Sequence, residues 1–153
     1  MSKESESAEL IMKLYELRRE PTMRDARNWY VTSFFPESAQ DIITALVSSE
    51  TSAYFRMVTS YWDMAAGFVN RGAIDEEMFH DSGGECVMVF SKVEPYIAEV
   101  RSIIGNSRMM SNLEALVMRL PDAKGLLAER REMIKRMMAA RANLSTGASP
   151  SGR

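Results

Sequence analysis

The segment of residues 50–72, ETSAYFRMVTSYWDMAAGFVNRG, decides the fold of this chain. Its large apolar residues recur at steps of three and one, which place side chains on one face of an α-helix. They are Tyr54, Met57, Val58, Tyr61, Trp62, Ala65, Phe68 and Val69. At 1.5 Å per residue this helix would be roughly 30 Å long, the width of a small domain. We therefore predict a central helix over residues 50–71 of an all-α domain.

Shorter segments with helical spacing flank the central helix on both sides. Pro21 and Pro36 separate the segments before it, because proline tends to end one helix and to open the next. After it, Ser111 and Glu114 match a capping box, a pattern that opens helices. The flanking helices are predicted at residues 7–20, 23–35, 38–47, 75–79, 111–120 and 122–142.

Residues 85–93 allow two interpretations. The segment contains VMVF at residues 87–90, which has the composition of a β-strand. A single strand would leave its backbone groups unpaired, and the sequence offers no second strand candidate. A helix that Pro95 kinks or splits also fits the apolar spacing of residues 86–104. The sequence leaves the choice between helix and extended chain open.

These segments predict an all-α fold, a single-domain bundle of six to eight helices over residues 1–143. A length of 153 residues suits one domain. Residues 144–153, LSTGASPSGR, are mostly small or polar, and we predict that they form a disordered tail.

The composition is that of a soluble globular protein, with 46% hydrophobic and 26% charged residues. The net charge of −2 gives no overall field that favours nucleic acid or membrane. The charge is nevertheless uneven: residues 1–100 carry 9 basic and 17 acidic side chains, and residues 101–153 carry 10 and 4. This asymmetry can steer a partner, or let the two halves of the chain attract each other.

Three features favour a cytoplasmic location. Cys86 is the single cysteine, so no intrachain disulfide can form, which is typical of a reducing compartment. The first nine residues, MSKESESAE, lack the basic and apolar regions of a signal peptide. No apolar run approaches the roughly 18 residues of a transmembrane helix, so we expect no transmembrane segment.

Glu76, His80 and Cys86 are the candidates for chemistry. Glu76 and His80 lie one helical turn apart, a spacing at which two side chains can bind one metal ion. Cys86 lies near a predicted helix start, where the helix dipole lowers a thiol pKa, and with His80 it forms a thiol–imidazole pair. Each also has a structural interpretation, a solvated acidic turn and a small residue in the core. We expect no metal and no cofactor, and an enzyme is the less favoured class.

The last predicted helix, residues 122–142, is basic and rich in methionine. Such a helix can bind a partner helix, an anionic surface or RNA, although it lacks aromatic residues to stack on single-stranded nucleic acid. It can equally pack against the core and expose a charged face. The candidate partner-binding residues are Arg130, Met133, Ile134, Met137, Met138 and Arg141.

Two further stretches belong together. Residues 54–77 form a long predicted helix that closes on NRGAIDEE, and residues 93–101 read VEPYIAEVR. This combination resembles a bacterial family of small helical domains of unknown function, over roughly residues 10–120. The resemblance implies an all-helical fold and supplies no catalytic residues. Members of that family often carry an N-terminal membrane helix, which is not found in this sequence.

We therefore expect a non-enzymatic helical interaction or scaffold protein that associates with itself or with another protein. Two other classes stay open. One is a small-molecule-binding or enzymatic helical domain with a pocket near the central helix and His80. The other binds an anionic surface or nucleic acid through the basic last helix, and its signature would be a steep salt dependence.

Overall fold

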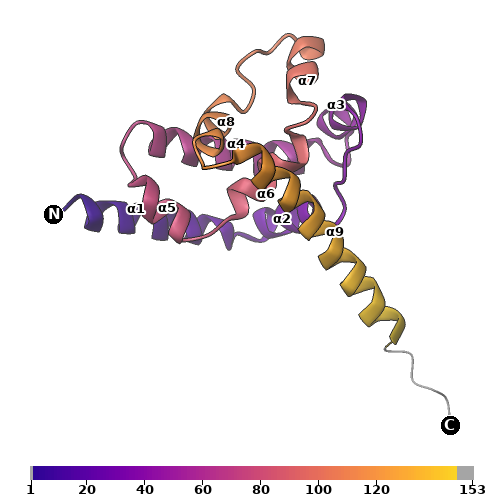
Figure 1. Cartoon of the computed structure of the whole chain (residues 1–153), viewed down its shortest axis with the longest axis horizontal. Helices are drawn as coiled ribbons and strands as arrows, with labels where there is room; N and C mark the ends of the chain where they lie inside the picture. Colours follow the sequence, from indigo (N-terminus) through magenta and orange to yellow (C-terminus); the bar gives the residue numbers. More distant parts are fainter. Residues whose placement is uncertain (1, 148–153) are drawn as a thin grey trace.

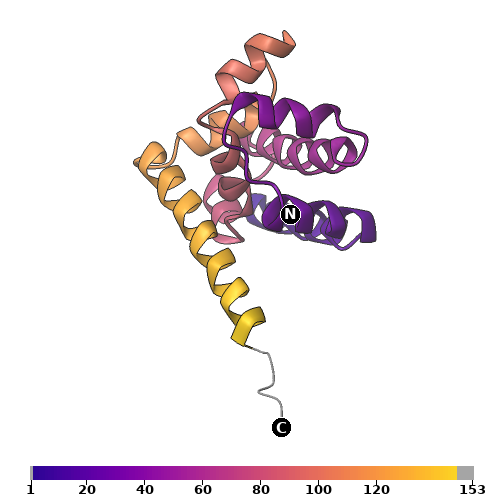
Figure 2. The same ribbon diagram turned by 90° about the vertical axis from the view of Figure 1, so that its right-hand side faces the viewer.

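The computed structural model describes residues 2–147, and within them it shows an all-α domain of nine helices (Figure 1). The predicted all-α single domain is confirmed, with one helix more than the six to eight expected. Figures 1 and 2 show α1 and α2 along one side of the body, with α4 lying over α2. The helices are α1 (Lys3–Arg18), α2 (Pro21–Thr32), α3 (Ala39–Val47), α4 (Ser52–Asn70), α5 (Glu76–Asp81), α6 (Glu85–Val93), α7 (Ile97–Ile104), α8 (Ser111–Met118) and α9 (Ala123–Gly147).

Helix α4 is the predicted central helix, and its ends agree with the prediction to within two residues. It packs against α2 and α8, and also contacts α3, α5 and α6. Its buried face differs in part from the predicted stripe: Phe55 is 1% exposed, whereas Phe68 is 42% exposed. A helix with neighbours on several sides buries a wider arc than a helix with one, and here that arc includes Phe55 and leaves Phe68 outside it.

Helix α6 lies inside the body, between α4, α8 and α9. Residues 86–93 are all buried, so the segment left open by the sequence is a helix enclosed by other helices. Residues 86–90 and Val93 are apolar and lie in the core, which explains why the composition resembles that of a buried strand, whereas Ser91 and Lys92 are buried with hydrogen-bond partners. Pro95 separates it from α7, because α6 ends at Val93 and α7 begins at Ile97.

Two buried tyrosines tie the N-terminal helices to the centre. The hydroxyl of Tyr30 in α2 donates to the backbone carbonyl of Val89 in α6, with 2.6 Å between the oxygens. The hydroxyl of Tyr61 in α4 donates to the carbonyl of Leu14 in α1 at 2.5 Å. Burial raises the pKa of Tyr30 and raises the pKa of Tyr61 to about 12, so both hydroxyls stay protonated donors at neutral pH.

The start of α8 is capped from α4 rather than by the predicted capping box. The residue before the helix is Met110, in a left-handed conformation with φ of 57°, and no side chain of that residue caps the helix. Asp63 of α4 instead accepts a hydrogen bond from the backbone N–H of Leu113 at 3.0 Å. Glu114, the predicted partner in the box, pairs with Arg101. The cap was wrongly assigned because a residue distant in sequence supplies the oxygen.

Helix α9 has a packed part and a projecting part. Its inner part contacts α6 and α8, and Ile134 is buried. Residues 135–147, called here the free end of α9, are all exposed except the half-buried Met138. Figures 1 and 2 both show this end leaving the body of the domain. Neither α9 nor any other helix within residues 2–147 has the length and apolar character needed to cross a membrane.

The predicted disordered tail begins too early. Residues 144–147 are helical, as the last turn of α9, and residues 148–153 lie outside the described residues. The hydroxyls of Ser145 and Thr146 donate to the carbonyls of Arg141 and Asn143, at 3.3 and 3.0 Å. Such bonds let small polar side chains remain within a helix, which their composition alone does not predict.

Replacing Asp63 tests the cap on α8. Asp63→Ala should lower the free energy of unfolding by about 1 kcal/mol, because the N–H of Leu113 loses its acceptor. Asp63→Asn should cost less, since its amide oxygen still accepts that bond. Urea denaturation followed by circular dichroism measures both. Equal losses for the two variants would contradict a capping role.

Candidate functional site

The carboxylate of Glu85 is the point at which four helices meet. Arg27 donates two hydrogen bonds to it, from Nε to Oε2 at 2.9 Å and from Nη2 to Oε1 at 2.8 Å. The indole Nε1 of Trp62 donates to Oε2 at 3.0 Å, and Nη2 of Arg18 lies 3.6 Å from Oε1. The three charged side chains are each less than one quarter exposed, so water screens their attraction weakly.

Each partner of Glu85 comes from a different helix. Arg18 ends α1, Arg27 lies in α2 and Trp62 in α4, while Glu85 is the first residue of α6. An acid at a helix start and a base at a helix end both suit the helix dipole. The planar guanidinium of Arg27 fits both carboxylate oxygens, and its hydrogen bond to Glu85 raises the pKa of Arg27. Both oxygens of Glu85 are therefore engaged by side chains of the fold.

Aromatic rings cover one side of this cluster. The guanidinium carbon of Arg18 lies 4.5 Å from the ring centre of Tyr15 and 5.4 Å from that of Trp62. The hydroxyl of Tyr15 donates to the backbone carbonyl of Ser82, which joins α1 to the loop before α6. The cavity enclosed here is about 70 Å³, so this side has room for a few waters and not for a larger ligand.

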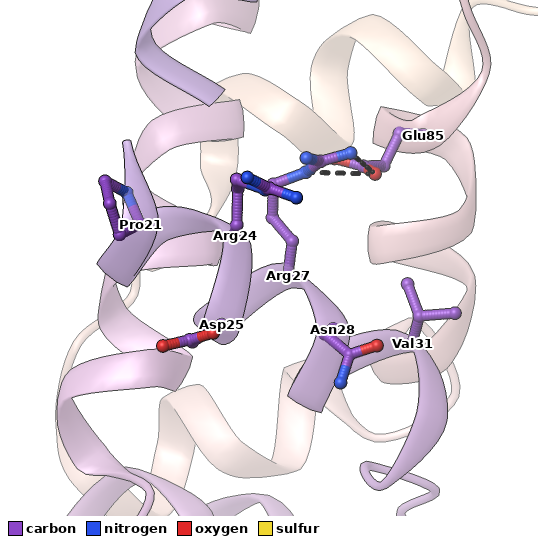
Figure 3. A pocket seen from close by; sticks show the side chains of 7 residues that line it. All are labelled: Pro21, Arg24, Asp25, Arg27, Asn28, Val31 and Glu85. Carbon is purple, nitrogen blue, oxygen red and sulfur yellow. Dashed lines mark hydrogen bonds and ion pairs between the residues drawn. The ribbon is translucent and has the colours of Figure 1, made fainter. Parts of the chain in front are cut away.

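A broad hollow of about 670 Å³ opens on the other side of the cluster (Figure 3). Figure 3 shows the side chain of Arg27 extended to Glu85, with Arg24 one turn earlier on α2. Arg24 is exposed, and its side chain makes no hydrogen bond or ion pair with any other residue in the range 2–147, so it is available to an anion. The lining residues are Pro21, Arg24, Asp25, Arg27, Asn28, Val31 and Glu85.

Lys92 is a second buried charged group, and it caps the end of α2. Its Nζ donates to the carbonyls of Tyr30 and Phe34, both at 2.6 Å, and to that of Val31 at 3.1 Å. The ring centre of Phe35 lies 3.9 Å from the same nitrogen. Burial lowers the pKa of Lys92 to about 7. A partly neutral amine can be a nucleophile, but this one is held by three carbonyls.

A cavity of about 210 Å³ lies beside Lys92, where the α2–α3 connection, the α6–α7 turn and α9 meet. Its walls are largely apolar, with charged groups at its edge. Arg131 at that edge is already engaged, because its Nη1 donates to the carbonyl of Ser91 at 2.9 Å. The lining residues are Phe35, Pro36, Glu37, Lys92, Pro95, Tyr96, Arg131, Ile134 and Lys135.

The predicted candidates Glu76, His80 and Cys86 do not form a shared site. Glu76 binds Arg119, the residue that follows α8, and the Nε of Arg119 lies 3.2 Å from the Oε1 of Glu76. His80 packs edge-on against Phe79, and its Nε2 has no hydrogen-bond partner in the described chain. Cys86 is buried, which raises the pKa of its thiol to about 12 and keeps it protonated. Within residues 2–147 no three His, Cys, Asp or Glu side chains are grouped so as to hold a metal ion.

The predicted partner-binding residues of α9 divide into two groups. Ile134 is buried and Met138 packs against the core, so these two face the domain. Arg130 also turns inward and lies against Gly84. Its Nη1 is 3.3 Å from the point at which a Cβ atom would stand if residue 84 had one. The exposed group is Met137 and Arg141, and Met133 lies half-buried between the two groups.

Glu85, which is partly buried, and Lys92, which is buried, are two charged centres not among the candidates from the sequence. For Lys92 the available signal was a lone charge within the apolar run of residues 86–93, since a buried lysine needs partners. For Glu85 the signal was an acid at the start of that run. Their hydrogen-bond partners lie 23 to 62 residues away along the chain, so no local pattern identifies them.

Neutralising Glu85 tests the four-helix junction. Glu85→Gln should lower the free energy of unfolding by about 2 kcal/mol or more, because Arg18 and Arg27 are left facing each other without a counter-charge. Glu99→Gln makes the same change on an exposed position of α7 and should be nearly neutral. Urea denaturation measures the free energy of unfolding of both variants. An equal loss in the two would contradict a stabilising role of Glu85 at the junction.

Lys92 should make stability depend on pH in a defined direction. The folded chain releases the Lys92 proton near pH 7, whereas the unfolded chain keeps it until about pH 10.5, so unfolding takes up a proton between these values. The stability of the wild type relative to Lys92→Met should therefore rise from pH 7 toward pH 10. Chemical denaturation at several pH values measures this difference. A difference that stays flat or falls would show that the folded-state pKa is not lowered.

Comparison with known proteins gives one match. A family described as "Domain of unknown function (DUF4760)" matches residues 4–120, which include α2 to α8, all of α1 but its first residue, and the whole Glu85 cluster. No curated protein and no solved structure matches the chain. Helix α9 lies beyond the matched residues, although its inner part packs on the matched domain. Since the match covers well over half of the chain, the protein belongs to the DUF4760 family.

Proposed function

We propose that this protein is a non-enzymatic helical interaction module that associates with itself through the free end of α9. The observation that supports this most directly is the projecting helix. From Ala139 to Gly147 every side chain is exposed, at the end of a helix whose earlier residues are packed. Since no other part of the described chain covers this end, a partner that packed on it would bury side chains that are otherwise in water.

The side chains of the free end suit a protein partner. Met137 is 54% exposed and Leu144 is 75% exposed, and they lie seven residues apart, on one face of the helix. Arg136 and Arg141 are exposed beside them. An apolar stripe flanked by charged residues is the pattern by which amphipathic helices bind other helices.

The buried ionisable groups also favour an interaction protein over an enzyme. Glu85 is neutralised by two arginines, Lys92 holds three carbonyls and Cys86 stays a protonated thiol. Each of these three groups is therefore accounted for by the fold. The free cysteine fits a reducing compartment, so a cytoplasmic location is part of the proposal.

Truncation tests the role of α9. A chain that ends at residue 138 keeps Ile134 and Met138 on the core and removes most of the free end. It should be a monomer at high micromolar concentration, whereas the full chain should have a larger mass by light scattering and sedimentation. A chain that ends at residue 147 keeps the whole of α9 and should associate like the full chain. A full chain that remains strictly monomeric would refute the proposal.

A further inference from the structure

The outward side of α1 is an acidic and apolar surface. Ser7, Ile11 and Leu14 face the core, and the opposite side of the helix is exposed. Met12 is 62% exposed there, and Leu10 is also exposed. The exposed residues on this side are Glu6, Ala8, Glu9, Leu10, Met12, Lys13 and Glu16, which we call the α1 outer face.

The charges of the α1 outer face have no partners within the domain. The side chains of Glu6, Glu9, Glu16 and Lys13 are exposed, and none makes a hydrogen bond or ion pair with another residue of the described chain. Three carboxylates against one ammonium leave a net negative surface. The α1 outer face therefore combines exposed apolar and charged side chains, as the free end of α9 does. Its net charge is negative, whereas that of the free end of α9 is positive.

The free end of α9 carries only positive charges. Lys135, Arg136 and Arg141 are its charged residues, and Lys135 is partly balanced by an exposed pair with Glu132 at 3.3 Å. Two such ends placed side by side would bring like charges together, which disfavours pairing of α9 with a second α9. The α1 outer face has a net negative charge, which is complementary to the positive charge of the free end of α9.

The two surfaces cannot meet within one molecule. Figures 1 and 2 show α1 along one side of the body and the free end of α9 pointing away from it. We propose that the free end of α9 docks on the α1 outer face of a second copy of this chain. The inference rests on the proposed self-association, and it specifies the surface that receives the helix.

The geometry sets the strength of this contact. Thirteen helical residues at 1.5 Å each give the free end a length of roughly 20 Å, comparable with the sixteen residues of α1. One short helix on an exposed surface buries little area, so the association should be weak and sensitive to salt. Charge on both surfaces therefore offers a sharp test.

Charge reversal on the full-length chain provides that test. The variant Glu9→Lys, Glu16→Lys should weaken self-association by about tenfold or more, because its α1 outer face now repels α9. The variant Arg136→Glu, Arg141→Glu should weaken it similarly. An equimolar mixture of the two variants should associate again, since each copy then meets an oppositely charged surface on the other. Sedimentation equilibrium measures all three, and circular dichroism confirms that each variant is folded.

A matched control shows whether the position of the reversed charges on α1, and not the change in the net charge of the whole chain, weakens the association. Glu50→Lys, Glu99→Lys changes two exposed acids away from α1 and should associate like the wild type. If Glu9→Lys, Glu16→Lys also associates like the wild type, or if the mixture fails to associate, the α1 outer face is not the docking surface. The proposed function stands in that case, provided that the chain ending at residue 138 is monomeric. A monomeric wild type would overturn both.

Discussion

The carboxylate of Glu85 connects helices that are otherwise distant in the chain. Arg18, Arg27 and Trp62 each reach it from a different helix, so one acidic group fixes α1, α2 and α4 against the first turn of α6. Such a charge is costly to bury alone and favourable when surrounded by well-oriented donors. The directionality of the arginine fork also specifies how α2 is rotated, which apolar packing alone does not.

Helix α6 gains its position from polar contacts at both ends. Glu85 anchors its start, and Lys92, near its other end, reaches the carbonyls at the end of α2. Between them Tyr30 donates to the carbonyl of Val89. Helix α2 is thus attached to α6 by hydrogen bonds at the start, the middle and the end of α6. The remaining surface of α6 packs on α8 and α9. This arrangement gives α9 a rigid base from which its free end projects.

Much of the fold could be predicted from the sequence, and little of the polar framework. The periodicity of residues 50–72 identified α4 because apolar spacing is a local property. The apolar run of α6 fits a helical spacing but has the composition of a strand at residues 87–90, so the choice between helix and strand stayed open there. Glu85, Lys92 and Asp63 act through partners on other helices, and a single sequence does not report which helices become neighbours. The candidates Glu76, His80 and Cys86 are close in sequence, yet Glu76 pairs with Arg119 and Cys86 lies in the core, contacts that proximity along the chain does not indicate.

The two tryptophans give this protein built-in optical labels for different regions. Trp62 is 5% exposed, and its indole N–H binds a carboxylate while an arginine lies over its ring. Trp29 is stacked on Phe34 with ring centres 5.1 Å apart, in an aromatic cluster at the α2–α4 contact. Emission from Trp62 therefore responds to the electric field at the junction of α1 and α6, and emission from Trp29 to the apolar packing of α2. Replacing Trp29 with phenylalanine leaves Trp62 as the single tryptophan, so movement of α1 can be followed in the unlabelled chain by exciting tryptophan selectively.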